Sequence, residues 1–313
     1  MLLREVLQTM DEIDSPSVSG ASIQRMFQEY GLDVQVTKVT GDKGFTDFVQ
    51  VRIPGTDGVS AGGRSRTLGI VGRLGGIGAR PSRIGIVSDA DGAVAAIAAG
   101  LKLARMHAIG DKLPGDVIIS THICPDAPTQ PHFPVDFMDS PVDIQTMNEY
   151  EIHEDMDAIL SIDTTKGNRI INHKGIAISP TVKDGYILKV SDDLVRVLEQ
   201  SSGELAKTFP LSLQDITPYG NDVYHLNSIL QPAVATEAPV VGVAITAVSA
   251  VPGCATGASH EMDIALAASY AVEVAKEFTG GKAEFYDAEE FARLQQLYGS
   301  MRIFRTLGRD QAE

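Results

Sequence analysis

Apolar and polar positions follow one another along this chain in patterns that predict both helices and strands. In residues 1–30 apolar side chains recur at helical spacing, and the turn at Ser15-Pro16 divides this segment into two helices. Residues 32–39 and 45–53 alternate apolar and polar positions, which is typical of a half-exposed antiparallel strand pair. From residue 67 onward short apolar runs alternate with helical segments, which indicates α/β architecture.

The core elements can be placed by residue number. We expect strands at 67–72, 83–88, 116–121, 158–163, 210–216 and 240–248, with a further strand pair within 168–182. We expect helices at 92–107, 192–202 and 262–278, and an amphipathic helix in the last 30 residues. The chain should form one domain with three parts, which are N-terminal helices and a hairpin (1–66), the core (67–280), and a C-terminal helix with its tail (281–313).

The composition of the chain excludes some classes of binding partner and of protein. The chain has 41 acidic and 26 basic side chains and a formal charge of -15, which argues against nucleic acids and anionic membranes as partners. The uncharged run 238–260 is long enough to span a membrane, but its prolines, glycines and β-branched centre predict a buried strand.

Cysteine usage and the N-terminal sequence bear on location. Cys124 and Cys254 lie far apart and form no CxxC pair, so neither a disulfide framework nor a zinc knuckle is indicated. The charged N-terminus leaves no room for the apolar core of a signal peptide. We therefore expect a cytoplasmic, bacterial protein with a small molecule as partner. Apolar faces on the first and last helices favour a homo-oligomer.

Polar side chains follow the ends of four predicted strands. They are Arg73, then Asp89 and Asp91, then His122, Cys124 and Asp126, and finally Asp163. Strands of one parallel sheet end on the same side, so these side chains can converge in a cleft. Each has a structural alternative, since an aspartate before a helix is a good N-cap and a lone cysteine is more often a small buried residue.

Further candidates lie beside these strand ends. Thr164, Thr165 and Lys166 follow Asp163 and could bind a substrate. The segment 214–227 offers Tyr219, Asp222 and His225, which suit either a polar small molecule or a turn. The glycine-rich segment 72–81 lacks both the spacing of a dinucleotide fingerprint and a Walker lysine, so no nucleotide cofactor is expected.

Three segments resemble the zinc-dependent exopeptidases with co-catalytic metals, a superfamily that includes bacterial aminopeptidases. The segment SDADG (88–92) resembles their bridging-aspartate element, ILSID (159–163) resembles a strand with a ligand aspartate, and GASHE (257–261) resembles the closing histidine element. The resemblance implies a three-layer α/β fold with a central mixed sheet. It also implies that Asp89, Asp163 and His260 hold one divalent metal, zinc or a similar ion. Only 15 residues separate Arg73 from Asp89, which leaves no room for the inserted lid domain of that superfamily.

The chain departs from the exopeptidase pattern at two motifs. Arg73-Leu74-Gly75 stands in place of His-x-Asp, and Cys124-Pro125 stands in place of Glu-Glu. The general base and several metal ligands would therefore be absent, although metal-assisted hydrolysis depends on both. Runs such as TLGIVGRLGGIGARP (67–81) and ILSIDTTKGN (159–168) carry a closer resemblance, which covers nearly the whole chain and is to a prokaryotic family known as a domain of unknown function.

Three functions follow as expectations. The first is a metal-assisted hydrolase of a small amide or peptide-like substrate, in which Arg73 grips a substrate carboxylate. Its candidate catalytic residues are Asp91, His122, Cys124 and Asp126. The second is a non-catalytic protein that derives from an exopeptidase and has a small-molecule-binding or regulatory role. The third is a hydrolase with Cys124 as nucleophile, which would need a histidine nearby.

Overall fold

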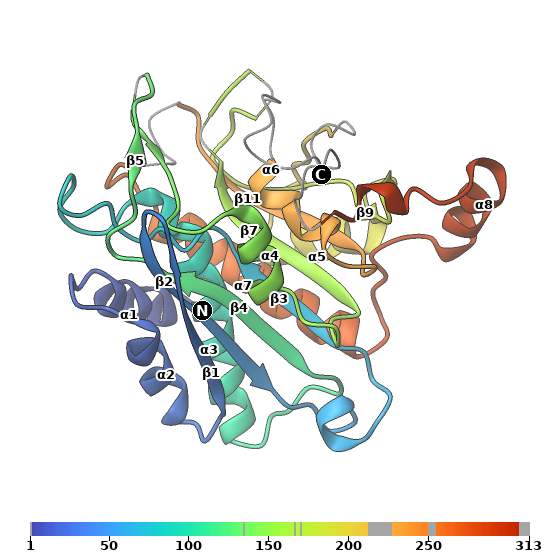
Figure 1. Cartoon of the computed structure of the whole chain (residues 1–313). Helices are drawn as coiled ribbons and strands as arrows, with labels where there is room; N and C mark the ends of the chain where they lie inside the picture. The colour runs from blue at the N-terminus through green and yellow to red at the C-terminus, as the bar shows by residue number, and fades with distance from the viewer. Residues whose placement is uncertain are drawn as a thin grey trace.

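In the part of the chain that the structure describes, a nine-stranded mixed sheet forms the centre (Figure 1). The computed structural model describes residues 2–133, 135–165, 167–169, 171–211, 227–249 and 255–306. The strand order is β1-β2-β4-β3-β7-β11-β9-β10, and β8 also pairs with β11. The strands are β1 (Val34–Gly41), β2 (Gly44–Ile53), β3 (Leu68–Gly72), β4 (Val117–Ile123), β7 (Ala158–Thr165), β8 (Gly175–Ile178), β9 (Val182–Lys183), β10 (Tyr186–Ile187) and β11 (Val240–Thr246).

The middle of the sheet is parallel and buried. Strands β4, β3, β7 and β11 run in one direction, whereas β2, β8 and β9 join them antiparallel. Every residue of β3, β4 and β11 is buried, because helices cover both faces of these strands. A separate small hairpin pairs β5 (Thr129–Gln130) with β6 (Phe137–Met138).

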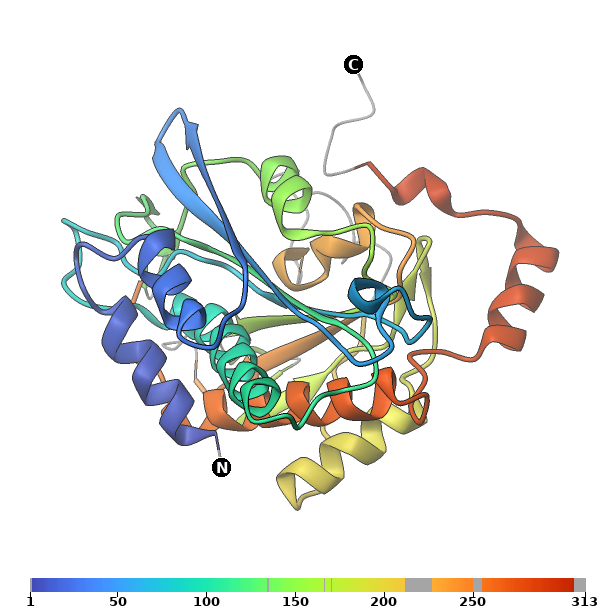
Figure 2. The ribbon, with the colours of Figure 1, turned by 90° about the horizontal axis from the view of Figure 1, so that it is seen from below.

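Helices form a layer on each face of the sheet, as Figure 2 shows edge-on. One face carries α1 (Leu3–Ile13), α2 (Gly20–Gln28), α3 (Asp91–Ala108), α5 (Asp192–Ser202) and α7 (Glu261–Thr279). The other carries α4 (Ile144–Glu151) and α6 (Asn227–Leu230). The Ala-rich helices α3 and α7 contact each other over the centre of the sheet, where small side chains permit close approach. Helix α8 (Ala288–Tyr298) lies at the margin and packs Phe291 on the β9–β10 hairpin.

Most predicted elements are confirmed within a few residues of their expected ends. Helix α5 spans 192–202 as predicted, and β7 and β11 contain the expected apolar runs. The hairpin of β1 and β2 is more than an N-terminal elaboration, because β2 pairs with β4 and extends the central sheet. No described helix is long and apolar enough to cross a membrane, and the run 238–260 contains the buried strand β11.

Two strand predictions are wrong. Residues 83–87 form a loop, in which the Val87 N–H donates to the Ile77 carbonyl at 3.1 Å and the Ile86 N–H donates to the Asp14 carboxylate at 2.7 Å. Strand β3 pairs with β4 on one side and with β7 on the other, so this segment cannot pair with β3. The described part of 168–173 is also irregular. Pro210 and Leu211 lie outside any strand, and the rest of that predicted strand falls outside the described residues.

Candidate functional site

Arg73 lies directly after β3 and is fully buried. Its backbone N–H donates to the Ile162 carbonyl at 2.7 Å, so the chain still follows β7 at this point. Its side chain is 0% exposed, with Nε 2.9 Å from Glu151 Oε2 and Nη2 donating to Asn148 Oδ1 at 2.5 Å. The guanidinium is therefore neutralised inside the protein. This differs from the predicted clamp for a substrate carboxylate, which would have to be accessible.

His122 completes this buried network from β4. Its Nδ1 lies 2.7 Å from Glu151 Oε1, and the Gly75 N–H donates to its Nε2 at 3.1 Å. A backbone N–H can only donate, so Nε2 is the acceptor and the ring proton sits on Nδ1, from where it is donated to Glu151. Both ring nitrogens are occupied, and neither is available to bind a metal or to move a proton.

Glu151 and Asn148 belong to α4, which the sequence patterns did not predict. The helix begins after Asp143, whose carboxylate accepts from the Thr146 N–H at 2.7 Å. Ile144 and Met147 pack on Phe48 of β2 and hold the helix against the sheet. An aspartate followed by apolar residues at i+1 and i+4 was the available signal for this helix. Its last residue, Glu151, joins Arg73 to His122.

Asp89 is held in a short 3-10 turn (Ser88–Ala90) beside the end of β7. The Ser88 carbonyl accepts from Thr164 Oγ1 at 2.8 Å, and the Ser88 N–H donates to the Thr256 carbonyl at 2.6 Å. Asp89 is 8% exposed, and its Oδ2 has no hydrogen-bond partner within the described ranges. Burial raises the pKa of Asp89 well above its ordinary value, and the charges of Asp163 and Asp91 raise it further.

Asp163 and Asp91 bring two more carboxyl groups to this end of the sheet. Asp163 is 3% exposed in β7, and its Oδ1 accepts from the Thr164 N–H at 2.7 Å. Asp91 begins α3, and Ser259 Oγ donates to its Oδ1 at 2.5 Å. Burial raises the pKa of Asp91 to about 7 despite the hydrogen bond from Ser259, with smaller contributions from two acidic residues of α7.

The predicted metal site is not assembled. The resemblance to exopeptidases implies a divalent metal, which in catalytic zinc sites has three protein ligands. Within the part of the chain that the structure describes, no three His, Cys, Asp or Glu side chains come together as such a site. His260, the third predicted ligand, is exposed at the N-terminus of α7. The described residues therefore do not provide the three ligands of such a site.

Asp89, His122 and Cys124 line one small cavity of about 10 Å³, which is the size of a single water molecule. Burial raises the pKa of Cys124 to about 11, so the thiol is neutral at neutral pH. His122 cannot activate this thiol because both of its nitrogens are engaged. Asp126 was predicted on the same face but is exposed and does not line the cavity.

The remaining predicted residues are placed as follows. Thr164 bonds to the Ser88 carbonyl, and Thr165 is buried at the end of β7. Lys166, Tyr219, Asp222 and His225 lie outside the described residues.

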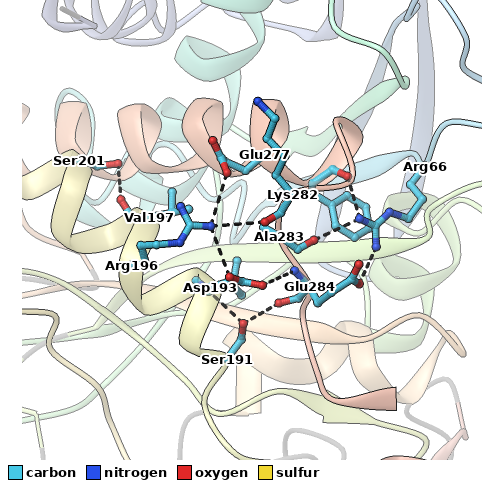
Figure 3. A network of polar contacts seen from close by, with 12 residues as sticks. Arg66, Ser191, Asp193, Arg196, Val197, Ser201, Glu277, Lys282, Ala283 and Glu284 are labelled. Carbon is cyan, nitrogen blue, oxygen red and sulfur yellow. Dashed lines mark hydrogen bonds and ion pairs between the residues drawn. The ribbon is translucent and has the colours of Figure 1, made fainter. Parts of the chain in front are cut away.

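A cavity of about 1080 Å³ lies at the opposite end of the sheet. Arg66, Asp157 and Pro239 line it; Asp157 and Pro239 immediately precede β7 and β11, and Arg66 lies two residues before β3. Figure 3 shows the polar network along one wall, where Arg66 donates to the Phe278 and Ala283 carbonyls and pairs with Glu284. Ligands of open α/β sheets bind at the carboxyl ends of the strands, so the site with Asp89 is the stronger candidate.

The comparisons with known proteins agree with this architecture. A family model described as "Protein of unknown function (DUF1177)" matches residues 37–308. The bottromycin maturation enzyme BotP in complex with Mn has 17% identity and a TM-score of 0.54, with 87% of this chain and 70% of that chain covered. A tomato leucine aminopeptidase mutant has 11% identity and a TM-score of 0.48, with 86% and 60% covered. No curated protein matches the sequence. The similarity to BotP confirms the predicted type of fold, and at this identity it shows the fold alone.

Proposed function

We propose that this chain, which belongs to the DUF1177 family, is a small-molecule-binding protein in which Asp89 receives a protonated amine of the ligand. One observation carries the proposal. The Asp89 carboxyl group is buried at the carboxyl end of the parallel strands, and one of its oxygens has no partner among the described residues. A buried polar group without a partner is costly, so a ligand that supplies the missing donor gains binding free energy.

A protonated amine suits this site better than a divalent metal does. An ammonium group carries a single charge and donates up to three hydrogen bonds, so one or two carboxyl oxygens are sufficient partners. Asp163 adds negative potential, as its effect on the pKa of Asp89 shows. Burial and the neighbouring carboxylates raise the pKa of Asp89, and the positive charge of an incoming ammonium would offset both effects by favouring the ionised carboxylate.

The neighbouring residues favour binding over hydrolysis. Arg73 and His122 are engaged with Glu151, and the Cys124 thiol is neutral, so His122 and Cys124 provide neither a free histidine nor an activated nucleophile beside Asp89. Metal-assisted hydrolysis is the second candidate, since the similar structure of BotP is a complex with Mn. The proposal keeps the cytoplasmic location that the sequence predicts.

Calorimetric titration tests the proposal. Wild-type protein is titrated with methylamine, with 1,4-diaminobutane and with Mn²⁺, and so are Asp89→Asn and Asp126→Asn. Asp126→Asn is the matched control because it removes an exposed carboxylate near the same strand end. We expect amine binding that weakens at least tenfold in Asp89→Asn and is unchanged in Asp126→Asn. No amine binding would refute the proposal. Stoichiometric Mn²⁺ binding that Asp89→Asn abolishes would establish a metal centre instead.

A further inference from the structure

We infer that residues 138–143, which we call the strap, open and close over the Asp89 cavity and control access to it. The strap begins at Met138, the last residue of β6, and leads into α4. Asp139, Ser140 and Pro141 line the cavity together with Asp89 and Cys124. The inference rests on the proposed function for the identity of the ligand, whereas the opening itself can be measured without any ligand.

The closed cavity is too small for a ligand. Its volume of about 10 Å³ accommodates one water molecule, and methylamine is larger. Gly76 shows how tightly the strap fits, because a Cβ on this glycine would lie 3.1 Å from the Met138 methyl group and 3.3 Å from Asp89 Oδ2. An amine therefore needs more room beside Asp89 than the strap leaves in this arrangement, and movement of the strap would supply it.

The tip of the β1–β2 hairpin (residues 41–45) holds the strap in place. Lys43 forms an ion pair with Asp139, and Gly41 lies directly against the Pro141 carbonyl. The Cys124 thiol in turn donates to the Phe45 carbonyl of the same hairpin at 3.5 Å. These contacts thus connect the hairpin tip to both the strap and Cys124, which line the cavity.

The bonds within the strap can move with it as a unit. The Ser140 N–H donates to Asp139 Oδ1 at 2.8 Å, and the Val142 N–H donates to Ser140 Oγ at 3.2 Å. Asp139 also ties the strap to other elements, because its N–H donates to the Pro128 carbonyl at 2.8 Å and its carboxylate pairs with Lys43, whose side chain is 54% exposed. Loss of this pair should favour the open strap while leaving the fold intact.

The rate at which Cys124 reacts with a thiol reagent tests the inference. The protein carries Cys254→Ser, so that Cys124 is the single thiol, and iodoacetamide labelling is followed by mass spectrometry under native conditions. We expect Lys43→Met to accelerate labelling about two- to fivefold, as fits the strength of an exposed ion pair. Asp139→Asn should act in the same direction. Lys189→Met is the matched control, because Lys189 forms an ion pair of similar exposure, 53%, on a distant surface.

The outcomes distinguish a failure of the strap inference from a failure of the proposed ligand. Labelling that Lys43→Met and Asp139→Asn leave unchanged, or that Lys189→Met accelerates equally, would overturn the inference. Labelling at the rate of global unfolding, measured in parallel by pulse proteolysis, would also overturn it. If Lys43→Met accelerates labelling but no amine binds, the strap inference stands and the proposed ligand is wrong.

Discussion

Removal of the Glu151 charge should destabilise the protein more than almost any other conservative substitution. Glu151→Gln leaves the fully buried Arg73 guanidinium without its counter-ion. Loss of one partner of a buried ion pair costs about 3–5 kcal/mol, a large part of the 5–15 kcal/mol that stabilises a typical domain. At about 2–4 °C per kcal/mol for larger domains, the thermal midpoint should fall by about 6–20 °C. Urea unfolding followed by circular dichroism measures the loss.

A double-mutant cycle shows whether the buried charge is the cause. In the background of Arg73→Met no cation is left unpaired, and a glutamine at position 151 can still accept the proton from His122 Nδ1. Glu151→Gln should therefore cost less than about 1 kcal/mol in that background. The control Glu149→Gln removes an exposed charge from the same helix and should change stability by less than about 0.5 kcal/mol. Equal costs of Glu151→Gln in the two backgrounds would refute the reasoning.

Three further predictions concern the same end of the sheet. Burial raises the pKa of Asp91 from 3.8 to about 7, so its contribution to stability is full below about pH 4 and is lost as the pH rises through 7. Asp91→Asn should thus be more stable than wild type at pH 8, by at most about 4 kcal/mol, and equal to it near pH 4 in urea unfolding. A difference independent of pH would contradict this. Gly75→Ala should destabilise the protein by more than about 2 kcal/mol in the same assay, because its Cβ would overlap His122, whereas a cost below about 0.5 kcal/mol would show that the loop adapts. Gly76→Ala should fill the space beside Asp89 and weaken amine binding at least tenfold in calorimetry without unfolding the protein, and unchanged affinity would place the ligand elsewhere.

Local patterns were sufficient to predict most of the fold. Strand β11 is specified by its own apolar run, and helix α5 is specified by its N-cap and its amphipathic pattern. Both elements lie where expected. The segment 83–88 has the same apolar character as a strand, yet Val87 packs with Ala79 and Ala255 in a small cluster away from the sheet. Periodicity alone cannot distinguish these outcomes, because the competition between strands for places in the sheet is decided by the whole chain.

The candidate site was predictable only in part. The motif SDADG correctly indicated carboxylates at a helix start near the strand ends, and Asp89 and Asp163 do come close together. The pairing of Arg73 was not foreseeable, because Asn148, its hydrogen-bond partner, lies 75 residues away on a helix that the patterns missed. From the sequence alone, an arginine at a strand end is interpreted as an exposed residue that binds a carboxylate, because the residue that neutralises it is not known.

The titration of the Asp89 carboxyl group tests the central claim most directly. In protein labelled with ¹³C at the aspartate carboxyl carbon, the Asp89 signal is identified by its loss in Asp89→Asn and is followed against pH with and without 1,4-diaminobutane. We expect this signal to titrate well above the ordinary range of aspartate in the free protein and to shift to lower pH when the amine is saturating. A signal that titrates in the ordinary range, or one that the amine leaves unmoved, would contradict the account.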